Sequence, residues 1–209
     1  MPSMRARPTR IVLVALLVVA ALALIAAVAV AAPILLHRSA GGSGQEVPSS
    51  TVSETSARGA DGRVRTLTAS DEDGPADLGS IEPGQQIRID GTGFDAGIGI
   101  YVAVCAVPET AGEKPGPCLG GIPEGAESGD VDTSRLTSAW VTDDWAWRGF
   151  ATHRYTDADA GSFSVALTMP DPSGEGLDCR QARCAIATRA DHTASADRVQ
   201  DMLLPIVYR

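Results

Sequence analysis

Residues 81–106 read IEPGQQIRIDGTGFDAGIGIYVAVCA and carry the clearest fold signal in the chain. Residues 87–90 (IRID) follow a Pro-Gly turn signal and alternate apolar with polar side chains, which predicts a strand with one buried face. From Ile98 to Val107 the apolar residues occupy both faces, which predicts a central strand. The segment between them, Gly91 to Gly97, has glycines that permit positive φ angles, and we expect Phe94 within it to reach the core.

Further stretches after residue 62 show the same short, β-branched pattern between turns rich in Gly, Pro and Asp, and none shows a sustained 3.6-residue period. They are Val64–Ala69, Ser138–Val141, Arg148–Tyr155, Phe163–Met169, Cys184–Thr188 and Leu203–Tyr208. Seven to nine strands with almost no helix predict an all-β fold, an antiparallel sandwich, over residues 63–209.

Residues 11–36 form an uncharged apolar run of 26 residues. As a helix this run would be about 39 Å long, enough to cross a hydrocarbon core of about 30 Å. The apolar part of a secretory signal is usually only about 7 to 15 residues long, so we expect a transmembrane signal anchor. Cleavage stays an alternative, because residues 27–31 contain small-residue cleavage patterns. The basic residues of the 1–10 segment favour a cytoplasmic tail, with the carboxyl-terminal domain outside the cell membrane.

Residues 37–62 are rich in Ser, Gly and Thr and poor in large apolar side chains. Such a segment buries too little surface to offset the entropy of ordering, so we predict a flexible linker between the membrane segment and the domain.

The formal net charge is −9, and four of the 17 basic residues (Arg5, Arg7, Arg10 and Arg38) flank the apolar run. Without those four, 13 basic residues face 26 acidic ones, a charge of −13. Such a field repels phosphate backbones, so we expect no direct nucleic-acid binding. The chain has no Asn and one lysine, Lys114, beside sixteen arginines, a coding bias typical of GC-rich genomes such as those of actinobacteria.

Four cysteines form two close pairs in the sequence, Cys105 with Cys118 and Cys179 with Cys184. Export favours oxidation, so we expect disulfides. The local pairing follows if both loops connect adjacent strands, and two other pairings are formally open. A zinc site is the alternative, but gaps of twelve and four residues do not fit the usual pair of C-x₂₋₄-C motifs, and we predict no metal site.

The stretch 81–106 resembles the amino-terminal half of the neocarzinostatin family, in which a Gly-x-Gly-apolar-x-Ala-Gly turn leads into a strand ending in Cys-Ala. Residues 159–161 before the Phe163 strand and the Cys179-x₄-Cys184 spacing extend the resemblance over about residues 64–208. The resemblance implies the local disulfide pairing and a seven-stranded immunoglobulin-like sandwich. It also implies a non-enzymatic carrier that holds an enediyne chromophore in a cleft.

The chain departs from this family between Cys118 and Asp159, where it carries an insertion rich in aromatic residues. Three of them, Trp140, Trp145 and Trp147, lie within eight residues, and Phe150 follows. We expect one tryptophan to pack in the core and the others to contact a ligand or partner. The insertion implies a remodelled cleft, so the ligand stays open.

The carboxyl-terminal part resembles small exported actinobacterial proteins that accompany surface haem receptors. The resemblance lies in residues 178–193, residues 197–201 and the final Pro-x-x-Tyr strand, and it implies an accessory role in haem uptake. His153 and Tyr155 alternate along one predicted strand, and because both residue types serve as axial haem ligands, they could face a haem iron. The competing interpretation is an exposed strand face.

His192 lies between Asp191 and Thr193 with Ser195 nearby, so a hydrolase is a further alternative. No Gly-x-Ser-x-Gly elbow supports it. We therefore predict a membrane-anchored, non-enzymatic binding module for a hydrophobic small molecule or a surface protein. Its candidate ligand-binding residues are Trp140, Trp145, Trp147, Phe150, His153 and Tyr155. A structural envelope protein is the remaining alternative.

Overall fold

The computed structural model describes residues 6–121 and 132–209, and its contacts divide the chain into two units, residues 1–37 and 38–209. The first unit contains helix α1 (Ala6–Leu36). Within it Thr9–Leu36 is long and apolar enough to cross a membrane. The predicted basic tail, residues 1–10, falls partly outside the described residues.

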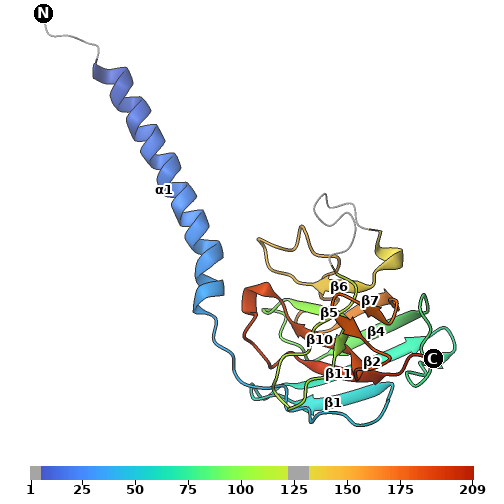
Figure 1. Cartoon of the computed structure of the whole chain (residues 1–209). Helices are drawn as coiled ribbons and strands as arrows, with labels where there is room; N and C mark the ends of the chain where they lie inside the picture. Colours follow the sequence, from blue (N-terminus) through green and yellow to red (C-terminus); the bar gives the residue numbers. More distant parts are fainter. Residues whose placement is uncertain (1–5, 122–131) are drawn as a thin grey trace, which may run out of the picture. The chain divides into compact units, whose positions relative to one another are not determined.

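The second unit is an antiparallel β-sandwich (Figure 1). One sheet has the order β1-β2-β4-β7, with β3 paired to β2. Its strands are β1 (Glu54–Arg58), β2 (Val64–Asp71), β3 (Gly74–Pro75), β4 (Gln86–Thr92) and β7 (Phe163–Thr168). The prediction of an all-β sandwich after one helix is thereby confirmed.

The second sheet has the order β11-β10-β5-β6, and all its pairings are antiparallel. Its strands are β5 (Ile100–Ala106), β6 (Ser138–Val141), β10 (Cys184–Ala190) and β11 (Met202–Ile206). A separate hairpin joins β8 (Ser173–Gly174) to β9 (Leu177–Asp178), and two short 3-10 helices are η1 (Thr133–Arg135) and η2 (His192–Ala194).

The core lies between the two sheets and follows from the period-two alternation. In β4, Ile87 and Ile89 are fully buried and alternate with more exposed polar residues. Each buried aliphatic side chain of this size contributes about 1.5 to 3 kcal/mol. Phe94 and Phe163 meet edge to face, with ring centroids 5.0 Å apart. The prediction that Phe94 reaches the core is confirmed.

Gly93 shows why the turn before β5 needs glycine. Its φ is +77°, and a Cβ there would lie 1.9 Å from the Val64 carbonyl oxygen. No other residue fits this close approach of two backbones. The turn thereby holds β4 and β5 in different sheets and sends Phe94 inward.

Residues 38–62 belong to the sandwich, in contrast to the flexible linker predicted over 37–62. β1 pairs with β2 in a five-residue register. The side-chain amide of Gln45 donates from Nε2 to the Leu203 carbonyl at 2.9 Å, and its Oε1 accepts from the Leu203 backbone amide at 2.8 Å. An edge strand is held by backbone hydrogen bonds, so a polar composition does not prevent its ordering.

Both disulfides pair locally, as expected. Cys105 at the end of β5 is bonded to Cys118, and Cys179 is bonded to Cys184 at the start of β10. The expected strand Arg148–Tyr155 is wrong, because the chain turns there. The amides of Trp147 and Arg148 both donate to the Asp144 carbonyl, and only His153 keeps a bridge to Val141.

Candidate functional site

The outer face of the β10-β5-β6 sheet carries one row of large side chains beside a row of small ones. Arg189, Tyr101 and Trp140 are direct cross-strand neighbours in the first row. Ala187, Ala103 and Ser138 form the next row. Neighbouring strands lie about 4.8 Å apart, so the small row leaves a floor that the large residues overhang on one side.

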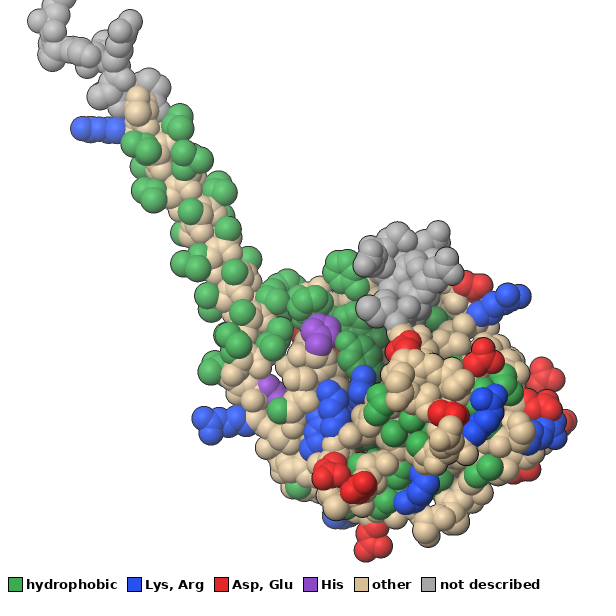
Figure 2. Space-filling view, in the orientation of Figure 1, with side chains coloured by type: hydrophobic (Ala, Val, Ile, Leu, Met, Phe, Trp, Pro, Cys, Tyr) green, Lys and Arg blue, Asp and Glu red, His purple; other side chains and the backbone are tan. Residues whose placement is uncertain are grey.

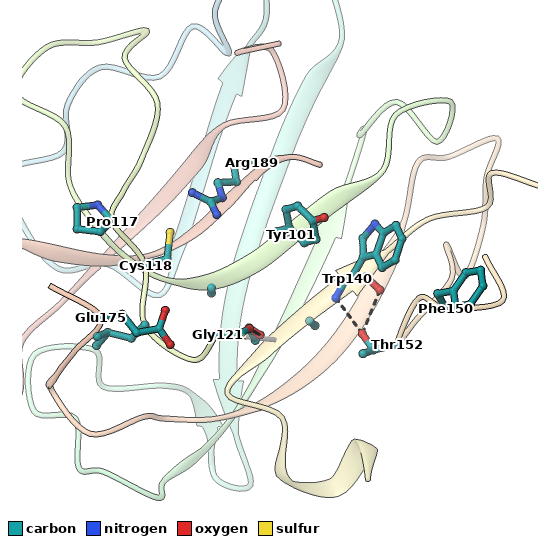
Figure 3. Close-up of a pocket in the computed structure, with 13 residues that line it drawn as sticks. Tyr101, Pro117, Cys118, Gly121, Trp140, Phe150, Thr152, Glu175 and Arg189 are labelled. Atoms are coloured by element: carbon teal, nitrogen blue, oxygen red, sulfur yellow. Dashed lines mark hydrogen bonds between the residues drawn. The ribbon is translucent and has the colours of Figure 1, made fainter. Parts of the chain in front are cut away.

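A cavity of about 730 Å³ opens over this floor (Figure 3). Tyr101, Trp140 and Phe150 form its aromatic wall, and Ala103 and Ser138 contribute to its floor. In Figure 2, hydrophobic side chains gather on the sandwich beside the grey residues. The cavity has the size and apolar character of sites for small organic molecules.

The Cys105–Cys118 disulfide positions the wall opposite the aromatic residues. It holds Cys118 beside β5, and the Leu119 amide donates to the Val104 carbonyl at 2.8 Å. Pro117, Cys118 and Leu119 thereby line the cavity. The Pro-rich loop that the sequence placed between the two cysteines is thus part of the site.

Trp140 is held from both ends. Its indole Nε1 donates to Asp191 Oδ2 at 2.9 Å. Its backbone amide donates to the Thr152 hydroxyl at 2.8 Å, and that hydroxyl donates to the Trp140 carbonyl at 3.0 Å. These bonds fix the orientation of the indole ring, which limits the entropy lost when a ligand packs against it.

His192 lies among aromatic rings at the edge of the cavity. Its Nδ1 is 2.8 Å from the Tyr101 hydroxyl. Trp147 and Trp140 meet its ring edge to face, with centroids 4.8 and 5.2 Å away. Burial, with repulsion from Asp191, raises the pKa of Tyr101, so its hydroxyl stays protonated at neutral pH.

Arg189 supplies positive charge at one end of the aromatic row. Its guanidinium carbon is 5.9 Å from the centre of the Tyr101 ring, within the range of a cation–π contact. Its Nη1 donates to the Pro115 carbonyl at 3.3 Å. The side chain is half-buried and lines the cavity.

The structure brings only some of the predicted ligand-binding residues together. Trp140 and Phe150 line the cavity, and Trp147 lies beside it against His192. Trp145 is 62% exposed and is not among the residues that line the cavity. None of the three tryptophans is buried in the core, which is filled by aliphatic residues and phenylalanines instead.

His153 and Tyr155 do not face a common ligand. Tyr155 is buried in the core and donates to the Ile98 carbonyl at 2.9 Å, and burial raises the pKa of its hydroxyl strongly. His153 is half-buried, with Nδ1 3.0 Å from the Thr152 hydroxyl, and burial lowers its pKa. The turn after Asp144 removes the regular alternation on which the shared-face interpretation rested.

Asp191 does not orient His192 as a general base. Its Oδ1 accepts from the Thr193 amide at 2.8 Å and the Thr193 hydroxyl at 2.5 Å, which caps η2, and its Oδ2 accepts from Trp140. The local geometry is a helix cap that also positions an indole. Within residues 6–121 and 132–209, no group of three or more potential ligand residues could hold a metal ion.

Sequence reasoning missed Tyr101, Arg189 and the Pro117 wall. The alternation in β5 already placed Tyr101 and Ala103 on one face. Their place in the cavity depends on which strands flank β5, and the register between strands cannot be deduced from the local sequence pattern.

Three comparisons with known proteins complete the description. No family model and no curated protein matches the chain. Among solved structures, macromomycin, a member of the neocarzinostatin family, aligns at 16% identity and a TM-score of 0.36. The alignment covers 69% of this chain and 99% of macromomycin.

Proposed function

We propose that the protein is a non-enzymatic binding module whose outer-face cavity takes a flat hydrophobic small molecule. The observation that carries this proposal is the cavity of about 730 Å³ over the small-residue floor, with Tyr101, Trp140 and Phe150 along one wall. Planar rings gain dispersion and offset stacking against such a wall. The hydrogen bonds of Trp140 hold the wall in place before a ligand arrives.

A small molecule fits this site better than a surface protein. The apolar surface is recessed between the disulfide wall and Trp140, whereas a protein interface generally needs a large exposed patch. Trp145, which is 62% exposed, is the most exposed of the four aromatic residues Trp140, Trp145, Trp147 and Phe150. It therefore serves as the matched control for the cavity.

Calorimetric titration of the full chain in lipid nanodiscs with 2-naphthylmethanol tests the proposal, with empty nanodiscs subtracted. We expect one molecule bound per chain. Trp140→Ala should weaken binding about tenfold, because a stacked aromatic contact and its buried area are worth about 1.5 kcal/mol. Ala103→Phe should abolish binding by filling the floor, and Trp145→Ala should leave it unchanged.

Thermal melts establish that each variant is folded. Wild-type affinity in folded Trp140→Ala and Ala103→Phe would overturn the cavity as the binding site. Loss of affinity in Trp145→Ala alone would assign binding to the exposed surface of the insertion.

We further propose that residues 11–36 anchor this module in the cell membrane, with residues 38–209 outside. One apolar helix and two disulfides are consistent with a single-pass membrane protein or a secreted one. The 26-residue length of the uncharged run favours the anchor. The intact mass of protein from its native membrane tests it: 21.6 kDa is expected, and a chain shortened near residues 27–31 would contradict it.

A further inference from the structure

Five polar side chains line the cavity, and three of them already have partners inside the protein. The five are Tyr101, Ser138, Thr152, Glu175 and Arg189. The Ser138 hydroxyl donates to the Gly121 carbonyl at 2.8 Å, and the Thr152 hydroxyl donates to the Trp140 carbonyl at 3.0 Å. The Tyr101 hydroxyl lies 2.8 Å from His192 Nδ1. The polar groups left for a ligand are therefore the two charged ones.

Arg189 has unused donors. A guanidinium carries five N–H groups, and the only side-chain hydrogen bond of Arg189 within the described residues is the one to the Pro115 carbonyl at 3.3 Å. No salt bridge involves Arg189 in that part of the chain. A half-buried cation without a carboxylate is costly, and an anion bound in the cavity would offset that cost.

Two carboxylates of this region, Asp191 and Glu175, form no ion pair with Arg189 in the described residues. Asp191, two residues along the chain, accepts from Trp140 and from both donors of Thr193. Figure 3 shows Glu175 and Arg189 on opposite sides of Cys118, and no salt bridge of the described residues joins them.

Arg189 is the only basic side chain among the described residues that line the cavity. Lys114, the single lysine of the chain, is exposed and does not line the cavity, and its pKa is lowered by desolvation and by repulsion from Arg189 and Arg198, with Asp201 opposing. The cavity thus presents one cation in a domain whose net charge is strongly negative. In such a domain the local field is the feature that separates an anionic ligand from a neutral one.

We propose that Arg189 makes this cavity selective for planar aromatic carboxylates. The ring packs on Trp140 and Phe150 over the small-residue floor, and the carboxylate accepts two parallel hydrogen bonds from the Arg189 guanidinium. The inference rests on the proposed small-molecule function and adds the chemical class of the ligand.

Two probes of nearly equal shape test it, 2-naphthoate and 2-naphthylmethanol, titrated into the full chain in nanodiscs of neutral lipid. A charge-assisted hydrogen bond is worth about 1.5 to 3 kcal/mol, so we expect naphthoate to bind at least about tenfold more tightly. Arg189→Gln should remove this preference, so that the two probes bind the variant with affinities within about twofold of each other. Arg180→Gln, at an exposed arginine outside the cavity, should change neither affinity.

The outcomes separate the two proposals. If neither probe binds, the small-molecule function fails, and the selectivity fails with it. If both probes bind wild type equally, or the preference survives in folded Arg189→Gln, selectivity through Arg189 is overturned and the function stands. Wild type supplies a check independent of folding: the preference should shrink several-fold between 20 and 500 mM NaCl, and a salt-independent preference contradicts the inference.

Discussion

Two arginines in this protein lie 5.9 Å from the centre of an aromatic ring, in opposite circumstances. Arg65 is fully buried over Phe94, and Arg189 is half-buried over Tyr101. The region around Arg65 is a closed network. The region around Arg189 opens into the cavity.

The closed network satisfies its charge internally. Arg65 makes two hydrogen bonds to Asp61, at 3.0 and 2.6 Å, and donates to Gln200 at 2.8 Å. The hydrogen bond from Arg65 lowers the pKa of Asp61, so this stabilisation is present above about pH 4 and is lost as the pH falls through the lowered value. Arg189, by contrast, forms no salt bridge within residues 6–121 and 132–209, which is the observation behind the proposed anionic ligand.

The largest effect should come from opening the closed network. Arg65→Met removes the hydrogen bonds that Arg65 donates to the Asp61 carboxylate and to Gln200, and removing one partner of a buried pair costs about 3 to 5 kcal/mol. We expect the lower end of that range, because the Asp61 side chain is still 17% exposed. Urea denaturation followed by near-ultraviolet circular dichroism measures the free energy of unfolding.

Arg189→Met is the matched control for that experiment. It breaks no ion pair of the described residues, so its free energy of unfolding should fall by less than about 1 kcal/mol. Equal destabilisation by the two variants would contradict the contrast between the closed and the open region.

Removing each disulfide in turn also compares a region that lines the cavity with one that does not, and we expect a smaller loss of stability. Loop closure credits the Cys105–Cys118 bridge, of sequence separation 13, with about 3 kcal/mol, and the Cys179–Cys184 bridge, of separation 5, with about 2 kcal/mol. Replacing either pair with alanine should reduce stability by about these amounts. Only the loss of the first should weaken 2-naphthylmethanol binding, because only that bridge holds a cavity wall.

Denaturation and titration of both double variants provide the measurement. If the Cys179→Ala/Cys184→Ala variant loses affinity as strongly as the other, the disulfide wall has no special role. If neither loses affinity, the Pro117 wall is held by the Leu119 backbone bond alone.

The fold could be predicted from the sequence because its strands alternate along the chain itself. In residues 87–90 and 98–107 the pattern of apolar side chains identifies the buried faces, even when the neighbouring strands are not known. β1 was missed because an edge strand is stabilised by backbone bonds to β2, and Ser and Thr give no hydrophobic signal.

The candidate site was only partly predictable. Trp140 and Phe150 stood out as aromatic residues in an insertion, and both line the cavity. Tyr155 was misassigned because the Asp144 turn could not be foreseen from a stretch with alternating side chains. Arg189 becomes meaningful only through the register that places it opposite Tyr101, two strands from Trp140.

The ion pair between Arg198 and Asp201 is intermediate between the fully paired Arg65 and Arg189, which has no ion pair in the described residues. Arg198 donates to Asp201 at 2.8 Å, and both side chains are largely buried, 14% and 8% exposed. The other oxygen of Asp201, Oδ1, is buried with no hydrogen-bond partner among the described residues. Burial raises the pKa of Asp201 to about 7, and Arg198 only partly opposes this.

The contribution of Asp201 to the free energy of unfolding changes with pH in the opposite direction to that of Asp61. Because Asp201 binds its proton more tightly in the folded state than in the unfolded one, stability should fall as the pH rises from about 4 to 7. The slope from this one group is at most about 1.4 kcal/mol per pH unit.

Asp201→Asn should remove this slope between pH 5 and 7. His153 contributes a slope of the other sign, because burial lowers its pKa, so the readout is the difference between wild type and variant in urea midpoints at each pH. A difference that does not change with pH would show that Arg198 neutralises Asp201 as completely as Asp61 is neutralised by Arg65. In that case the Arg198–Asp201 pair would belong with the closed network, and Arg189 would stand apart as the one of these three arginines without an ion pair in the described residues.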